Sequence, residues 1–338
     1  MIAFIIRRLF ATVLLLILVS LITFCIFFLV PRIAGQNTYD LALQYTGRTP
    51  TRQTVLQVEQ QLGLNKPLYL QYGRFLKGIV AGEHYNAGPV KVWCPPPCLG
   101  YSFRNQQPVW PQMVGNIPVT LSLAAGAAVF WLVGGVSIGV ISALRRGKPI
   151  DRFSMVIALA GVSLPIFFTG QLVQTVFVYG QPLTLFPSIH YVPIQQNPLQ
   201  WAENLFLPWV TLAFLYAALY ARLTRAGMLE TMNEDYIRTA RAKGLPERTV
   251  ILKHGLRSAL TPIITIFGMD LGLLLGGAIL TEYTFNLYGL GLFTIEAINN
   301  QDLPEIMGVT LLAAFFVVIA NLVVDILYAV VDPRVRLS

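Results

Sequence analysis

Residues 222–265 read RLTRAGMLETMNEDYIRTARAKGLPERTVILKHGLRSALTPIIT, a basic stretch between two apolar segments. Apolar side chains recur at helical spacing in its first half, at Met228, Leu229, Met232, Tyr236, Ile237 and Ala240. Gly244 suits the end of that helix, because glycine tolerates the left-handed conformation just after a helix. Pro246 suits the first turn of a second helix over 247–259, where its missing N–H is not needed. The stretch therefore predicts two short helices that meet at a sharp corner.

The segments around this corner have the composition of a membrane protein. Of the 338 residues, 55% are hydrophobic and 12% are charged, and soluble domains are about one quarter charged. A transmembrane helix needs about 20 apolar residues. Six segments meet that need: Leu9–Val30, Pro118–Leu144, Phe153–Gly180, Leu205–Ala221, Pro262–Thr281 and Ile306–Val331. A cleaved signal peptide is the alternative for the first, but its apolar run is longer than the 7–15 residues typical of signal peptides.

Basic residues predict the orientation of these spans. With the N-terminus in the cytoplasm, 16 of the 24 Lys and Arg residues fall in cytoplasmic segments, and the outer segments 181–204 and 282–305 contain none. This is the positive-inside pattern. It accounts for the net charge of +8 without a nucleic-acid partner. We therefore expect an all-α integral membrane protein with six transmembrane helices and both termini in the cytoplasm.

Three regions follow from this topology. Residues 1–30 form the cytoplasmic N-terminus and first span, 31–117 an extracellular or periplasmic segment, and 118–338 the core with a cytoplasmic loop at 222–261. In the outer segment, helices are predicted over Thr54–Leu62 and over Leu68–Ile79, the second lying on the bilayer surface, followed by a packed loop.

Cysteine usage excludes a disulfide scaffold and a cysteine-rich metal site, because there are only three. Cys94 and Cys98 lie on the oxidising side, where a disulfide is expected. An extended Pro-Pro-Pro between them would hold the cysteines too far apart, so the loop must bend, for example through a cis proline. Cys25 lies in the first span and is interpreted as packing.

Residues 235–245, DYIRTARAKGL, resemble the EAA loop of ABC-importer permeases for dipeptides and oligopeptides, a family that also contains nickel and glutathione permeases. Arg238, Thr239 and Ala240 occupy the Glu-Ala-Ala places of the general pattern, and Gly244 occupies its glycine. The acidic residue and the later proline of the general pattern are absent, and the peptide branch of the family shows the same variation.

The resemblance extends over nearly the whole chain. Matching motifs are Ile6-Arg7-Arg8-Leu9, LGLNKPL at 62–68, ALRRG at 143–147, NLVVDILY at 321–328 and Asp332-Pro333-Arg334. They indicate the B-type permease, the longer of two paired subunits. Residues 84–98 look like an insertion relative to this family.

The resemblance implies a type I ABC-importer permease fold in the plasma (inner) membrane of a prokaryote. Its partners would be a second, C-type permease, two ATPase subunits, an extracellular or periplasmic substrate-binding protein and a peptide substrate. The residues expected to couple to an ATPase are Glu234, Asp235, Tyr236, Arg238, Thr239, Ala240, Arg241, Lys243 and Gly244. No G-x-x-x-x-G-K-[ST] motif occurs, so ATP and its magnesium would be bound by the ATPases. No nucleophile–base pair or metal-ligand spacing suggests an enzyme or a metal site.

Two acids lie within the predicted spans. Asp270 stands beside a row of small residues, Gly268, Gly272 and Gly276, a spacing that allows close helix packing. This row is interpreted as part of a central helix near the subunit interface or the pathway, with packing inside this subunit as the alternative. An intramembrane acid is a functional candidate. Asp270 therefore either lines the pathway, where it could meet a peptide ammonium, or has a structural hydrogen-bonded role. Asp325 is expected to pair with Asn321 one turn away.

A carrier or channel driven by an ion gradient is the alternative from another class. Such proteins typically have helices broken at the membrane midplane and internal repeats. The sequence indicates neither clearly, and that alternative leaves the Gly-Leu-Pro corner unexplained.

Overall fold

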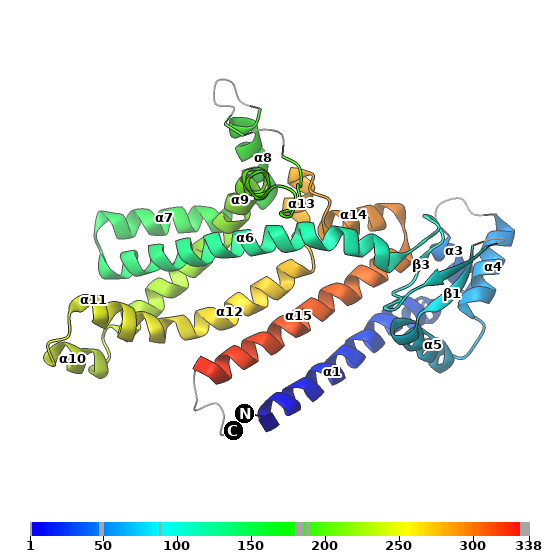
Figure 1. The fold of residues 1–338 in the computed structure, drawn as a ribbon, viewed down its shortest axis with the longest axis horizontal. Helices are drawn as coiled ribbons and strands as arrows, with labels where there is room; N and C mark the ends of the chain where they lie inside the picture. The colour runs from blue at the N-terminus through cyan, green and yellow to red at the C-terminus, as the bar shows by residue number, and fades with distance from the viewer. Residues whose placement is uncertain (1, 47–50, 88–89, 180–184, 187–188, 332–338) are drawn as a thin grey trace. The chain divides into compact units, whose positions relative to one another are not determined.

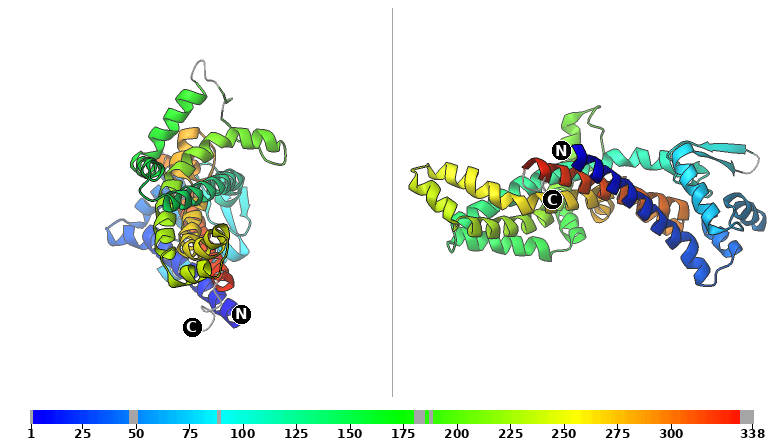
Figure 2. Two further views of the ribbon diagram at one scale, coloured as in Figure 1. Left: turned by 90° about the vertical axis from the view of Figure 1, so that its left-hand side faces the viewer. Right: turned by 90° about the horizontal axis from the view of Figure 1, so that it is seen from below.

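The computed structural model describes residues 2–46, 51–87, 90–179, 185–186 and 189–331. Its contacts divide the chain into two units, which we describe separately (Figures 1 and 2). Unit 1 comprises Met1–Thr120, Leu275–Ile279 and Tyr288–Ser338, and unit 2 comprises Leu121–Leu274 and Leu280–Leu287. The Asp332-Pro333-Arg334 motif and Gly180 lie outside the described residues.

Two long apolar helices pack along each other in unit 1. Helix α1 (Ile2–Phe24) continues through a π-helical turn, η1 (Cys25–Leu29), into α2 (Val30–Ile33), and it lies beside α15 (Leu303–Val331). Helix α14 (Leu290–Asn300) precedes α15 and contacts it. Asp325 on α15 forms an ion pair with Arg8 on α1 at 3.1 Å. The expected pairing of Asp325 with Asn321 is therefore wrong, because an oppositely charged side chain on the neighbouring helix is within reach.

Three helices follow α2: α3 (Thr38–Tyr45), α4 (Arg52–Leu62) and α5 (Leu68–Ala81). The two helices expected in this segment are thus confirmed, each with slightly different ends. Thr51 caps α4 by accepting a hydrogen bond from the Thr54 N–H, and Gly63 ends it in the left-handed conformation (φ 63°). The apolar sides of α3 and α4 bury Leu41, Val55 and Val58 in one cluster with aromatic residues from α1 and η1.

The packed loop expected after α5 is wrong, because this region contains strands. Strands β1 (Glu83–Ala87) and β2 (Val90–Cys94) pair antiparallel, with Glu83 opposite Cys94, and β3 (Tyr101–Ser102) pairs with β4 (Gln107–Pro108). The first pair is rich in the aromatic and β-branched residues that favour strands. The long apolar segments are all helical, and among the described residues the strands are confined to 83–108. A disulfide joins Cys94 to Cys98 with Cα atoms 5.5 Å apart, and the Pro96–Pro97 peptide bond is cis.

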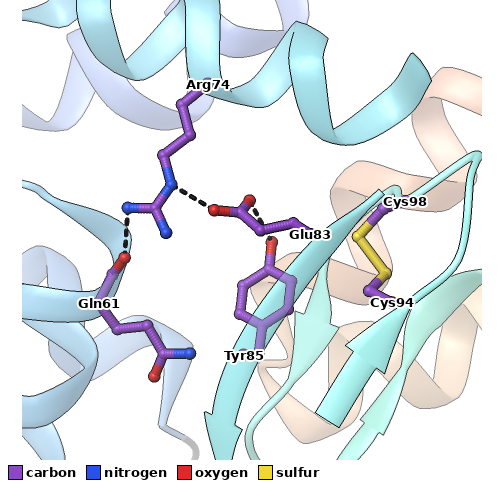
Figure 3. Close-up of polar contacts among 6 residues, drawn as sticks. All are labelled: Gln61, Arg74, Glu83, Tyr85, Cys94 and Cys98. Atoms are coloured by element: carbon purple, nitrogen blue, oxygen red, sulfur yellow. Dashed lines mark hydrogen bonds and ion pairs between the residues drawn. A yellow bond between two sulfur atoms is a disulfide. The ribbon is translucent and has the colours of Figure 1, made fainter. Parts of the chain in front are cut away.

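A partly buried polar network ties this hairpin to the helices beside it (Figure 3). Arg74 on α5 forms an ion pair with Glu83 and donates a hydrogen bond to the Gln61 carbonyl at 2.6 Å. The Tyr85 hydroxyl donates to Glu83 at 3.3 Å. Burial, with the adjacent Glu83 carboxylate, raises the pKa of Tyr85, so this hydroxyl keeps its proton and remains a donor. The segment 84–98, which looks like an insertion in the sequence, thus contains most of a packed hairpin and a disulfide that lies in the same cluster as Tyr85.

Unit 2 is a set of packed helices entered through α6 (Val109–Leu144). It contains α7 (Pro149–Ser163), α8 (Ile166–Phe177), α9 (Pro198–Thr231), α12 (Arg257–Leu275) and most of α13 (Ile279–Phe285). Helices α6 and α9 approach closely at Gly126, where a Cβ atom would lie 2.0 Å from the Trp209 ring. The Trp209 indole donates to the Ser122 carbonyl at 2.9 Å. Glycine on α6 therefore provides the space that a large aromatic side chain on α9 fills.

Five of the six predicted spans correspond to long apolar helices, but their ends differ, and α12 ends at Leu275 instead of Thr281. Helix α6 begins nine residues before Pro118, and α9 extends beyond both ends of Leu205–Ala221. The predicted third span is broken into α7 and α8, and the chain bends by 106° between them. Leu164 has extended backbone (φ −85°, ψ 128°) and precedes Pro165, which disfavours the helical conformation there. In the described part of the chain, five helices are long and apolar enough to cross a membrane, or six if α7 and α8 form one span.

Candidate functional site: the corner between α9 and α12

The first half of the basic stretch is two helices rather than one. Helix α9 continues to Thr231, a turn follows, and α10 covers Asp235–Ala242. The prediction of one continuous helix from Met228 to Ala240 is therefore wrong. The Asn233 side chain donates a hydrogen bond to the Leu229 carbonyl at 2.8 Å. In a continuing helix, this carbonyl would instead accept from a backbone N–H four residues further on.

Helix α10 is amphipathic, and its apolar side is anchored. Ile237 and Ala240 are buried against Val250, which belongs to the π-helical segment η2 (Val250–Leu256). Met232 in the preceding turn packs against the same cluster. The periodicity of the sequence placed Ile237 on the apolar side of a helix, but only the structure shows that this side chain packs against η2.

The corner after α10 has the backbone that its sequence predicts. Gly244 adopts a left-handed φ of +74°, and Pro246 immediately precedes α11 (Glu247–Thr249). Arg241 before the corner and Glu247 after it form a two-pronged ion pair, with N–O distances of 3.2 and 2.7 Å. The second helix is not a separate short one: α11, η2 and α12 form one uninterrupted helical run. A displacement of the corner would therefore act directly on α12.

Most of the residues expected to couple to an ATPase lie on one exposed surface. Glu234, Asp235, Tyr236, Arg238, Thr239, Arg241, Lys243 and Gly244 are exposed, whereas Ala240 is buried. Figure 1 shows α10 beyond the end of α9 and beside α11. Ala240 therefore faces the η2 contact, and the exposed residues form a charged surface of mixed sign that a partner could contact.

The elements beside this corner meet around α9. Met228 packs with Ala143 of α6 and Ala259 of α12. The Arg225 guanidinium donates two hydrogen bonds to the Asp151 carboxylate of α7, at 2.7 and 2.9 Å. The Ser142 hydroxyl also donates to Asp151, and so does the Gly147 N–H at 2.9 Å. Sequence reasoning did not pair Arg225 with Asp151, because residues so far apart in the chain carry no common motif.

Asp270 lies on α12 next to aromatic side chains. The Tyr220 hydroxyl of α9 donates to the Asp270 carboxylate at 2.8 Å. Gly268 and Gly272 are buried, and Gly276 lies just after the end of α12. The first two glycines therefore pack within this chain, on a side of α12 different from that of Asp270. Among the residues that the structure describes, no three potential metal ligands converge.

Comparisons with known proteins agree with this arrangement. Residues 135–337 match the family described as binding-protein-dependent transport system inner membrane component, and residues 1–124 match the N-terminal model of the same system. The chain is 36% identical to a dipeptide transport system permease protein, DppB, of Escherichia coli K12, over 99% of each chain. It is also 36% identical to a putative peptide transport system permease protein of Brucella abortus strain 2308, again over 99% of each.

A solved structure supports the fold independently. An inward-facing conformation of the MetNI methionine ABC transporter matches with a TM-score of 0.52 and 20% sequence identity, over 66% of this chain and 97% of that one. At this identity the likeness concerns the fold alone. Together with the two family models and the full-length relatives, these findings establish that the chain belongs to the family of binding-protein-dependent transport system inner membrane components, as a non-catalytic, multi-pass permease subunit of the peptide-importer type.

Proposed function

We propose that this chain is the B-type permease of an ABC importer for dipeptides and oligopeptides, and that α10 receives the force of ATP binding from an ATPase subunit. The names of its full-length relatives support a peptide substrate. In this family ATP is bound by the partner ATPase, so the energy must enter this chain through a contact surface.

The main support for this proposal is the packing of α10 against η2. The helix exposes its charged side while Ile237 and Ala240 fix it to η2, and η2 continues without a break into α12. A push on α10 is therefore transmitted to a spanning helix instead of being absorbed by a flexible loop. This is hinge-like coupling, in which closure of the ATPases would swing the spans between inward- and outward-facing states.

The remaining parts of the proposal concern topology and partners. We propose six crossings in the type I arrangement, with both termini in the cytoplasm and the segment from about residue 31 to 117 outside. The full importer would contain a C-type permease that forms the other half of the pathway, two ATPases and a substrate-binding protein. The hairpin at 83–94 would lie on the side where that protein delivers peptide.

Reconstitution tests this function. The chain should co-purify with two ATPase subunits and a second permease, and proteoliposomes of that complex should accumulate a radiolabelled dipeptide or tripeptide only with ATP and the binding protein. Deletion of residues 235–244 should abolish uptake while the two permeases still associate. Transport driven by a proton gradient without ATPases would instead support a carrier, and ATP-driven uptake of nickel or glutathione in preference to peptides would change the substrate.

A further inference from the structure

Asp270 lies at the edge of an aromatic cluster in unit 2. The Trp131 ring of α6 stacks on Tyr216 with centroids 4.8 Å apart, and contacts Tyr220 and Phe267 at 6.3 and 6.0 Å. Tyr220, whose side chain is fully buried, donates a hydrogen bond to the Asp270 carboxylate. The carboxylate thus lies against one edge of this cluster.

This carboxylate has no cationic partner among the described residues, where no ion pair involves it. Its hydrogen bond from Tyr220 comes from a neutral donor and occupies the Oδ2 atom. Asp270 is only partly buried, so its carboxylate can still be approached. A carboxylate placed within a membrane-spanning helix is costly unless it meets an opposite charge. The local chemistry therefore favours a cation that can donate hydrogen bonds to the carboxylate, such as a primary ammonium group.

An apolar groove lies one helical turn from Asp270. It has a volume of about 300 Å³ and is lined by side chains of α6 and α12, including Val133, Val136, Ser137, Ile263, Ile264 and Phe267. Phe267 belongs both to this groove and to the aromatic cluster around Trp131. On a helix, residues three apart are neighbours, so Phe267 places the end of the groove beside Asp270.

We propose that this pair of features forms a binding site for the amino terminus of a peptide. The ammonium group would lie against the side of the Asp270 carboxylate that Tyr220 does not occupy, and the first apolar side chain would occupy the α6–α12 groove. The charge of Asp270 selects this occupant over a lipid chain, which would leave the carboxylate unpaired. The inference rests on the proposed function, since it names the part of the substrate that this permease contacts.

Binding to the assembled importer, without its binding protein, tests the site directly. The importer of two permeases and two ATPases in nanodiscs would be titrated with the tripeptide Phe-Ala-Ala and with its N-acetyl form, using ligand-observed NMR. Removing a hydrogen bond to a charged group is expected to weaken binding by about tenfold or more. The acetylated peptide should thus bind the unsubstituted importer at least about tenfold more weakly than the free peptide does, by the same estimate.

Substitutions assign this preference to Asp270. The Asp270→Asn variant should bind the two peptides equally, and Asp270→Glu, which keeps the charge, should retain the preference. Asp325→Asn is the matched control, because it neutralises an acid on another spanning helix and should leave the preference intact. Equal binding of both peptides by the unsubstituted importer, or a preference that survives Asp270→Asn, would overturn the site.

Two further outcomes bear on the occupant of the groove and on the proposed function. Retention of a lipid in the groove by native mass spectrometry, unchanged by saturating peptide, would assign the groove to lipid and overturn the proposal. The proposed function is judged separately, by co-purification of the ATPases and ATP-dependent peptide uptake. An importer that transports peptides but shows no amino-terminal preference at Asp270 would remove only this inference.

Discussion

The Asp151 carboxylate receives four hydrogen bonds, from Ser142, from the Gly147 N–H and twice from Arg225. A carboxylate offers about four acceptor positions, so this one is saturated. Its donors come from the end of α6, from the α6–α7 turn and from α9. A single side chain thus fixes the relative positions of three helices next to the corner that carries α10.

Replacement of Arg225 should therefore destabilise the permease. We expect Arg225→Met to lower the thermal unfolding midpoint of the purified importer by several degrees, because the Asp151 carboxylate loses two of its donors. Arg225→Lys should rescue only part of the loss, since an ammonium cannot reproduce the planar two-pronged contact. Arg222→Met is the control, because Arg222 lies on the same helix but is exposed. Equal midpoints for the two Met variants would contradict the assigned role.

The close approach of Gly126 to the Trp209 ring leads to a second prediction. An added methyl group at Gly126 would overlap the Trp209 ring at 2.0 Å, so Gly126→Ala should force α6 and α9 apart. Overpacking of this kind costs about 1–3 kcal/mol, and we expect a lower yield of folded, monodisperse importer. Gly134→Ala on the same helix meets no atom within 4 Å and should be tolerated. Size-exclusion profiles of the two variants measure this difference.

At the scale of elements, hydropathy predicted where the spans lie but not where they end. Apolar runs identify the part of a helix that needs lipid, whereas the ends of α9 contain polar residues that packing stabilises. Asn204 and Thr224, for example, are buried. The break at Leu164–Pro165 was visible as a proline signal, but the uninterrupted apolar run outweighed it. The hairpin at 83–94 was missed because its strands are short and depend on long-range packing, including the Arg74–Glu83 pair.

The candidate site was predicted more completely than the fold around it. The Gly244 corner and the exposed charged residues depend on local backbone preferences, which sequence reveals. The sequence did not show that Ala240 is buried, because the direction of its side chain depends on how α10 packs against Val250. The Asp270–Tyr220 contact could not be predicted, since it joins two helices whose rotation about their axes is set by packing.

The attachment of α10 leads to a prediction about coupling. Ile237→Ala would remove the main buried side chain between α10 and η2, a change that costs about 2–5 kcal/mol in a packed core. A loosened α10 should still bind the ATPase but transmit less motion. We therefore expect ATP hydrolysis to continue while the number of peptides transported per ATP falls. Leu252→Ala, at an exposed position of η2, should leave this ratio unchanged. An unchanged ratio for Ile237→Ala would show that α10 is held by other contacts.

At the scale of the whole molecule, the bend between α7 and α8 determines the topology. If this pair crosses the membrane as one interrupted span, the chain has six crossings and both termini lie on the same side. If the pair enters and leaves on one side, only five crossings remain and the termini lie on opposite sides. The positive-inside pattern favours six, because Arg145, Arg146, Lys148 and Arg152 precede the pair and the segment 181–204 after it has no Lys or Arg.

Cysteine labelling on either side of the bent pair distinguishes the two topologies. Arg146 and Gln195 are both exposed and flank α7 and α8 in sequence, so Arg146→Cys and Gln195→Cys form a matched pair. In intact cells a membrane-impermeant maleimide should label the Gln195→Cys variant and spare the Arg146→Cys variant, which should react only after permeabilisation. The unsubstituted chain gives the background, since Cys94 and Cys98 are bonded to each other and Cys25 lies within α1–η1. Labelling of both variants from the same side of the membrane would show that α7 and α8 form a re-entrant loop. The chain would then have five crossings, and its α9–α12 corner could lie in the cytoplasm only if the N-terminus were outside.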